Sequence, residues 1–178
     1  MIKVIAFDLV GVLVGEKNNV LNEIEDKLER LFGPNINDED YIIRSKEIIT
    51  NSNIELFTKN IISKLYRIRE ENLIENLRGK YPNIKIIIAT NHLSYVKDFI
   101  NENFNVDDVI ISAEINKIKP NSDLYQFILD KYNLKPNELL FLDDNIENVE
   151  GAKELGINVI KVEKEMNLLN EIEKYMEV

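Results

Sequence analysis

Hydrophobic residues recur along this chain with two different periods, and the change from one period to the other divides the sequence. Residues 3–14 begin with a short apolar run that leads into a carboxylate, Asp8, and a glycine, Gly11. Further short apolar runs lie at residues 84–89, 109–111, 139–142 and 158–162. Short, nearly continuous apolar runs bounded by polar turns are typical of strands buried on both faces of a parallel sheet.

Between the first two apolar runs, hydrophobic residues recur at helical spacing instead. The first such segment begins at Val20, and we expect Asn18 or Asn19 to cap it and Gly33-Pro34 to stop it. Further amphipathic segments follow at residues 38–49, 54–68 and 73–77. Residues 16–80 are therefore predicted to be all-helical, without strands.

After residue 84, strands and helices alternate. Helices are expected at residues 95–102, at 122–129 with Ser122 as the cap, at 146–155 with Gly156 closing the helix, and near the C-terminus. This alternation predicts a doubly wound, Rossmann-like α/β fold with a five-stranded parallel sheet. We expect a discontinuous core domain of residues 1–15 plus 81–178 and a helical cap domain of residues 16–80.

Length, net charge and cysteine content exclude several kinds of binding partner and of catalytic or metal site. The chain has 178 residues, enough for one core, and a formal net charge of −10, which argues against nucleic acid or an anionic membrane as a partner. Cysteine is absent, which excludes a disulfide, a thiolate nucleophile and a Cys-based zinc site. The short N-terminal apolar run lacks a basic leader and a cleavage site. We expect a cytoplasmic protein that is a monomer or a homodimer.

Polar residues follow several of the predicted strands. They are Asp8, Thr90-Asn91 and Asp143-Asp144, and Lys119 stands before the helix that follows the third strand. Because parallel strands end at one edge of a sheet, we expect these side chains to converge. Carboxylates hold Mg²⁺, a lysine attracts phosphate, a hydroxyl and an amide can donate to phosphate oxygens, and a further carboxylate can attack phosphorus. The pattern predicts a magnesium-assisted phosphoryl site.

The segments FDLVGVL (residues 7–13), ATN (89–91), KP (119–120) and FLDDNIENVEGA (141–152) stand in the order of the four motifs of the haloacid dehalogenase (HAD) superfamily. The chain resembles most closely its phosphatase branch with a small helical cap between motifs one and two, like the N-terminal phosphatase of epoxide hydrolases and the sugar-phosphatase-like members. Motifs carry the resemblance in the core. In the cap it rests on position and helicity alone.

This resemblance implies a role for each matching residue. Asp8 would be the nucleophile and a metal ligand, while Lys119 would steady both the nucleophile and the phosphate. The remaining roles are a grip on the phosphoryl oxygens by Thr90 and Asn91, direct metal ligation by Asp144 and by the backbone carbonyl of Val10, outer contact with the metal by Asp143, and orientation of the acidic pair by Asn148. The implied cofactor is Mg²⁺ and the implied partner is a small phosphorylated metabolite.

The chain departs from the family pattern at Val10, where phosphatases of this family usually carry a second Asp that protonates the leaving alcohol and then activates water. Valine can do neither, and loss of such a group typically costs about 10²–10⁴-fold in rate. His92 could carry protons instead, but a substrate-facing or solvent position is the interpretation we favour. Lys117 is the alternative to Lys119.

Three hypotheses follow from these residues. The first is a Mg²⁺-dependent phosphomonoester hydrolase that acts through an aspartyl-phosphate on Asp8, with a small metabolite such as a sugar phosphate as substrate. The second is a phosphate-binding or regulatory protein whose turnover is weakened by Val10. The third is a metal-independent haloacid dehalogenase, against which the acidic pair Asp143-Asp144 counts.

Overall fold

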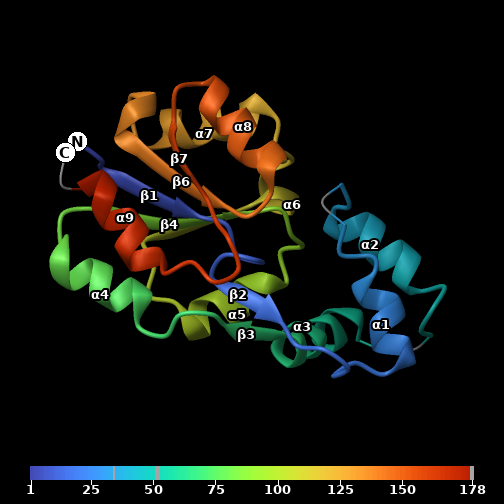
Figure 1. Ribbon diagram of the computed structural model, residues 1–178. Coiled ribbons are helices and arrows are strands. Elements are labelled where there is room, and N and C mark those ends of the chain that lie inside the picture. The colour runs from blue at the N-terminus through green and yellow to red at the C-terminus, as the bar shows by residue number, and fades with distance from the viewer. Residues whose placement is uncertain (34, 51–52, 177–178) are drawn as a thin grey trace.

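A parallel sheet lies at the centre of the protein, described here by a computed structural model for residues 1–33, 35–50 and 53–176 (Figure 1). Its five strands stand in the order β5-β4-β1-β6-β7. They are β1 (Val4–Phe7), β4 (Lys85–Thr90), β5 (Asp108–Ile111), β6 (Leu139–Asp143) and β7 (Asn158–Lys161), and every neighbouring pair is parallel. The prediction of a doubly wound, five-stranded α/β fold is confirmed.

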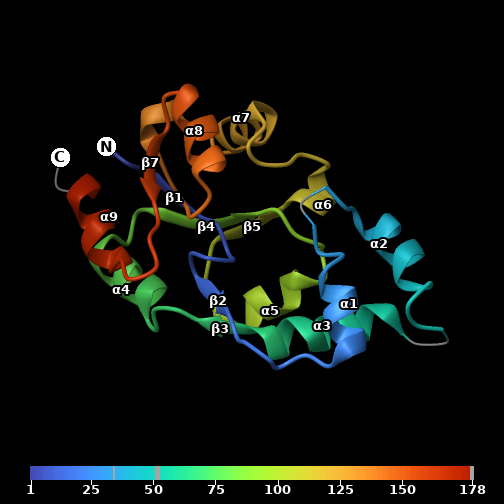
Figure 2. The same cartoon turned by 45° about the vertical axis from the view of Figure 1, so that its right-hand side comes forward.

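Helices cover both faces of this sheet (Figure 2). One face carries α7 (Ser122–Lys131) and α8 (Ile146–Glu154), and the other carries α4 (Leu73–Lys80), α5 (Val96–Asn103) and α9 (Leu168–Met176). Strand residues alternate between the two apolar clusters, so that Ile5 and Phe7 pack on the α5 side and Val4 and Ala6 on the α7 side. Burial on both faces explains why the strands read as continuous apolar runs.

The segment between β1 and β4 holds α1 (Glu23–Glu29), α2 (Asp38–Ser45) and α3 (Ile54–Leu65), which stand to one side of the sheet (Figure 1). It also holds strands, contrary to the all-helical prediction for residues 16–80. β2 (Val14–Glu16) and β3 (Tyr66–Ile68) pair antiparallel, with Val14 opposite Ile68. The chain leaves and re-enters the core at this ribbon, where the two crossings satisfy each other's backbone groups.

Several element boundaries differ from the sequence prediction. Asn22, rather than Asn18 or Asn19, caps α1, because its side-chain oxygen accepts the N–H groups of residues 24 and 25 at 3.0 Å each. Asn121 occupies the N-cap position of α7, and Ser122 is already helical. α2 ends at Ser45, short of residue 49, and α1 ends at Glu29, while the expected stop at Pro34 lies outside the described residues.

The division between core and cap at residues 15 and 80 stays a prediction. α4 lies beside α9 in both views (Figures 1 and 2), and its buried residues belong to the same apolar cluster as Ile5 and Phe7 of β1. A short helix, α6 (Ser112–Ile115), follows β5, and a 3₁₀ turn, Pro136–Glu138, precedes β6. Within the part of the chain that the structure describes, none of the helices has the length and apolar character needed to cross a membrane.

Candidate active site

Two neighbouring strands bring three carboxylates together at one edge of the sheet. β1 ends just before Asp8, and β6 ends at Asp143, with Asp144 next. Phe7 pairs with Leu142 in the parallel ladder, and the backbone N–H of Asp8 donates to the Leu142 carbonyl at 2.8 Å. One carboxylate oxygen from each Asp lies within 4.8 Å of the others, a spacing that suits a shared divalent cation.

Lys119 bridges two of these carboxylates. Its Nζ lies 2.8 Å from Asp8 Oδ1 and 2.7 Å from Asp143 Oδ2, and the residue is only 3% exposed. Burial lowers the pKa of Lys119, but the two carboxylates outweigh that effect and raise the pKa above its ordinary value. Lys119 is therefore a permanent cation. Lys117, the alternative from the sequence, pairs with Asp123 at 3.2 Å instead.

Asp8 is short of compensating positive charge. Burial raises its pKa to about 6, with Lys119 opposing that shift and Asp143 adding to it. A second cation beside Asp8 would favour the ionised carboxylate that a nucleophile requires. Two observations therefore fit a divalent cation at this site: the spacing of the carboxylates and the raised pKa of Asp8.

Asp143 is held by more hydrogen bonds than its neighbour. Its Oδ1 accepts the Asn145 N–H at 2.8 Å and the Asn148 side chain at 3.1 Å, while its Oδ2 accepts Asn148 at 3.0 Å in addition to Lys119. Asp144 is exposed and lies beside this network. Asp143 is thus occupied with positioning, which leaves Asp144 the better placed of the pair for direct contact with a metal.

Gly11 sets how closely the loop after β1 approaches Asp144. Its φ is +85°, and a Cβ at this position would lie 2.1 Å from Asp144 Oδ2. Any side chain would therefore both strain the backbone and collide with the carboxylate. Arg69 donates to the Gly11 carbonyl and, at 2.7 Å, to the Lys164 carbonyl, which ties this loop to the segment after β7. Sequence reasoning treated Gly11 only as a turn and did not find Arg69.

The two remaining motifs meet at the Lys119-Pro120 bond, which is cis. The Asn91 side chain accepts the Lys119 N–H at 3.0 Å and donates to the Lys119 carbonyl at 2.9 Å. Thr90 ends β4 and is buried. A Cβ on Gly151 of α8 would lie 2.5 Å from the Pro120 carbonyl, so a glycine there permits close packing. In this structure the Asn91 side chain positions Lys119, and its grip on phosphate stays a prediction.

Comparison with known proteins assigns the chain to a protein family. The sequence profile of the haloacid dehalogenase-like hydrolases matches residues 5–162. The chain belongs to that family. It is a HAD-like hydrolase, and the resemblance drawn from its four motifs is confirmed.

Individual relatives match parts of this HAD-like hydrolase. Bifunctional epoxide hydrolase 2 of Rattus norvegicus is 40% identical over 68 residues, which is 38% of this chain and 12% of that protein. (S)-2-haloacid dehalogenase 4A of Burkholderia cepacia is 34% identical over 61 residues, 34% of this chain and 26% of that protein. The chain thus spans only a small part of these curated relatives.

Solved structures extend the likeness to nearly the whole fold. An Asp-to-Ala variant of a HAD family enzyme from Bacteroides thetaiotaomicron, solved with magnesium and inorganic phosphate, superposes with a TM-score of 0.77 at 18% identity. The superposition covers 96% of this chain and 99% of that one. At this identity the likeness shows the shared fold.

A cavity of about 360 Å³ opens over the strand ends of the HAD-like hydrolase. The expected residues Asp8, Val10, Thr90, Asn91, Lys119, Asp144 and Asn148 line it, together with Asn35, Ile118, Asn145 and Glu147, among others. Asn35 comes from the segment between α1 and α2. Asn35 and Ile118 lie outside the four motifs, and Asn145 and Glu147 lie within the fourth motif but not at its acidic pair. The order and spacing of the motifs therefore did not predict that these four residues line the cavity.

His92 is neither a substrate-facing nor a solvent residue, which corrects the interpretation from sequence. It is only 4% exposed, its Nε2 is 2.9 Å from the Tyr66 hydroxyl, and its backbone N–H donates to Ser112 at 3.0 Å. Burial lowers its pKa to about 4. A neutral, enclosed imidazole bonded to Tyr66 is a poor proton carrier, and His92 instead joins β3 to the loop after β4.

Proposed function

We propose that this protein is a Mg²⁺-dependent phosphomonoester hydrolase that acts through an aspartyl-phosphate on Asp8, with a small phosphorylated metabolite as substrate. The observation that carries the proposal is the double ion pair of Lys119, 2.8 Å from Asp8 and 2.7 Å from Asp143, with the Asp144 carboxylate alongside. A buried nucleophilic carboxylate next to a fixed cation is suited to attack on phosphorus, where negative charge must be balanced.

In this mechanism a carboxylate oxygen of Asp8 attacks phosphorus, and the bond from phosphorus to the leaving oxygen breaks. The leaving oxygen departs with that electron pair, and the phosphoryl group stays on Asp8. Water then forms a bond to the same phosphorus while the bond from phosphorus to Asp8 breaks, which returns the Asp8 carboxylate and releases inorganic phosphate. The proton that this water loses to solvent balances the one that the leaving oxygen takes up from solvent. Lys119 offsets negative charge in both steps, and Thr90 and Asn91 hold the phosphoryl oxygens.

Mg²⁺ fits this site as a resident cofactor. Asp8, Asp144 and the Val10 carbonyl would hold it, because hard oxygen ligands suit Mg²⁺ and Asp143 is occupied by other bonds. When bound, the ion would supply positive charge next to the phosphoryl group. Asp143 and Asn148 then act through position, keeping Lys119 and the acidic pair in place.

Val10 shapes which substrates can react. Val10 lines the cavity, and its side chain cannot protonate a leaving alkoxide. The rate contribution of about 10²–10⁴-fold that a positioned acid normally provides is therefore missing. A leaving group that is a weak base needs that proton least. We therefore expect acyl, aryl or anomeric phosphates to turn over faster than esters of simple alcohols.

Phosphate release with Mg²⁺ and with EDTA, from acetyl phosphate and a panel of phosphate esters, tests the proposal. Asp8→Asn should lower release at least about 10³-fold, because the nucleophile is lost. The surface variant Asp130→Asn is the matched control, since Asp130 is exposed on α7 and its side chain accepts a hydrogen bond from Gln126, away from the site. Acid-quenched protein should carry one phosphoryl group on wild type and none on Asp8→Asn. Unchanged release in Asp8→Asn would refute the mechanism.

A phosphate-binding protein with weakened turnover is the second candidate, and Val10 is the observation that favours it. Calorimetric binding of inorganic phosphate in the presence of Mg²⁺, together with release at background from the whole panel, would support it. A metal-independent dehalogenase is the third, in line with the relative from Burkholderia cepacia. Halide release from 2-haloacids that persists in EDTA would favour that activity, although such chemistry has no use for Asp144.

A further inference from the structure

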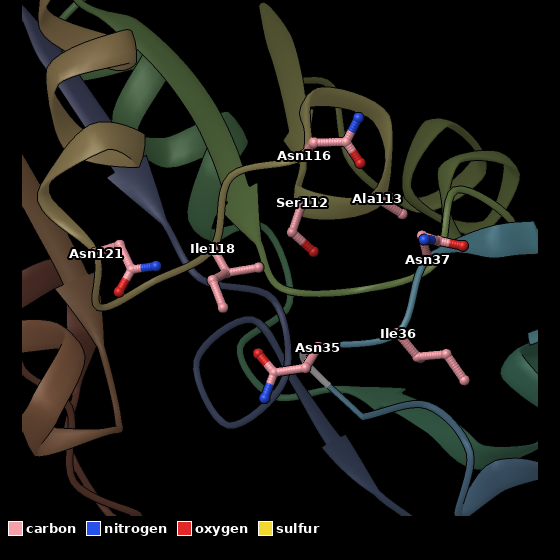
Figure 3. Close-up of a pocket in the computed structure, with 8 residues that line it drawn as sticks. All are labelled: Asn35, Ile36, Asn37, Ser112, Ala113, Asn116, Ile118 and Asn121. Atoms are coloured by element: carbon pink, nitrogen blue, oxygen red, sulfur yellow. The ribbon is translucent and has the colours of Figure 1, made fainter. Parts of the chain in front are cut away.

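A second cavity, of about 330 Å³, adjoins the active-site cavity (Figure 3). The two share Asn35 and Ile118, and Ile118 directly precedes Lys119. Figure 3 shows its sticks on three segments: residues 35–37 between α1 and α2, helix α6 with the residue after it, and the stretch 118–121 that leads into α7. A substrate with its phosphoryl group at Asp8 therefore has open space beside it for the rest of the molecule.

The walls of this second cavity are rich in unpaired carboxamides. Asn35, Asn116 and Asn121 line it, and in the described part of the chain none of their side chains hydrogen-bonds to protein. Asn37 also lines it, with its oxygen used to accept the Asp40 N–H at 2.9 Å and its nitrogen available. Each free carboxamide offers both donors and an acceptor, which matches a hydroxyl group that is itself donor and acceptor.

The charges around the two cavities oppose an anionic leaving group. Among the described lining residues Lys119 is the one cation, and it is already paired with Asp8 and Asp143. Glu147 adds a negative charge at the active-site cavity. A carboxylate or second phosphate on the substrate would find like charge and no partner. The same described residues include no aromatic ring, so an aryl group would lack a stacking surface.

We propose that the second cavity binds the alcohol part of the substrate, and that this part is an uncharged polyhydroxyl compound, a sugar or a polyol. Asn35 and Asn116 are the specificity-determining residues, since they line the cavity from two separate segments, one between α1 and α2 and one after α6. This inference rests on the phosphatase function proposed above. Together with Val10, which favours a weakly basic leaving oxygen, it points to a phosphate on the anomeric oxygen of a sugar.

Matched substrate pairs test the charge argument. Glucose 6-phosphate against 6-phosphogluconate, and glycerol 3-phosphate against 3-phosphoglycerate, differ by a carboxylate while the phosphate stays on a primary alcohol. We expect kcat/KM to be at least about tenfold higher for the neutral member of each pair. Glucose 1-phosphate should exceed glucose 6-phosphate. Equal or reversed preferences within the carboxylate pairs would overturn the inference.

Variants of the two asparagines test the site itself. Asn35→Ala and Asn116→Gly each remove one carboxamide, and glycine is chosen because Asn116 has a φ of +52°. Each should lower the ratio of kcat/KM on glucose 1-phosphate to kcat/KM on acetyl phosphate by about five- to tenfold, as expected for one lost hydrogen bond to substrate. Asn101→Ala, on the exposed side of α5, is the control and should leave the ratio unchanged.

The outcomes separate the inference from the function on which it rests. Turnover of acetyl phosphate with an unchanged ratio in both asparagine variants would overturn the polyol site alone. Absence of turnover on acetyl phosphate and on every sugar phosphate would overturn the phosphatase and the polyol site together. A lowered ratio in either variant, with the neutral preference in both pairs, would support the site.

Discussion

Two surfaces of the active site are built in opposite ways. The strand-end floor (Asp8, Thr90, Lys119, Asp143 and Asn148) is buried, and its charged groups are tied together by ion pairs and hydrogen bonds. The asparagine wall (Asn35, Asn116 and Asn121) is exposed, and in the described residues its side chains form no such bonds. In the function proposed above, the floor would hold the phosphoryl group, which is the same in every substrate. The wall would face the rest of the substrate, which differs from one substrate to another.

The largest expected effect comes from breaking the floor at its centre. Lys119→Met removes the cation between Asp8 and Asp143 and leaves two buried carboxylates facing each other. We expect phosphate release to fall about 10³-fold, as for loss of a main electrostatic contact in a water-poor site. Lys117→Met is the matched control, because Lys117 pairs with Asp123 on the surface and not with the carboxylates of the site. Phosphate release and a thermal melt should be measured on both.

Equal loss in the two lysine variants would contradict the special place of Lys119. A Lys119→Met protein that fails to melt cooperatively would show that the ion pairs are needed for folding as well. In that case Lys119→Arg, which keeps the positive charge, should restore folding while still slowing release, since its planar guanidinium cannot reproduce the compact ammonium between the two carboxylates.

Val10→Asp tests the position beside the floor where this chain lacks the acidic side chain that phosphatases of the family usually carry. A carboxylate at this position can protonate the leaving oxygen and activate water, so we expect release from glucose 6-phosphate to rise by up to about 10²-fold. Release from acetyl phosphate should change little, because its leaving group needs no proton. Val10→Asn, similar in size but without the acid, is the control. A similar gain on both substrates would argue against a missing acid.

The floor could be predicted from the sequence for a physical reason. In a parallel sheet all strands end at one edge, so residues after the apolar runs must converge there however far apart they lie in the chain. Asp8, Thr90 and Asp143 follow this rule. Lys119 follows no strand directly and was expected there from its place before the helix that follows the third strand, while the family resemblance supplied its role. Asp8 alone was ambiguous, because a single Asp after a strand can also cap a turn.

The asparagine wall and the ribbon of β2 and β3 could not be predicted in the same way. Asn35 reaches the site from a loop outside any strand or regular helix, and asparagine is common in turns whatever its purpose. The ribbon of β2 and β3 was missed because each strand has only three residues, too few for a period-two pattern to outweigh the helical segment before it. His92 was misplaced because its partner, Tyr66, is distant in sequence.

His92 offers a smaller test, at the contact between β3 and the loop after β4. The unfolded chain takes up a proton on this residue below about pH 6.5, whereas the folded protein does so only below about pH 4. The free energy of unfolding should therefore decrease as pH falls between these values, by about 2 kcal/mol from pH 7 to pH 5. Urea unfolding of wild type and His92→Asn at both pH values checks this. A pH dependence that is the same in both proteins would contradict it.

The smallest expected effect lies at the edge of the floor, at Asn148. Asn148→Ala removes the amide that donates to both oxygens of Asp143, yet Asp143 keeps the Asn145 N–H at 2.8 Å and Lys119 at 2.7 Å. We therefore expect only about a tenfold rise in the Mg²⁺ concentration for half-maximal release, typical of a residue that acts through a ligand. The control variant Asn101→Ala should leave the Mg²⁺ concentration for half-maximal release unchanged. Because the loss acts through the metal site, saturating Mg²⁺ should restore most of the rate, and a defect that Mg²⁺ cannot relieve would place Asn148 in direct contact with the phosphoryl group instead.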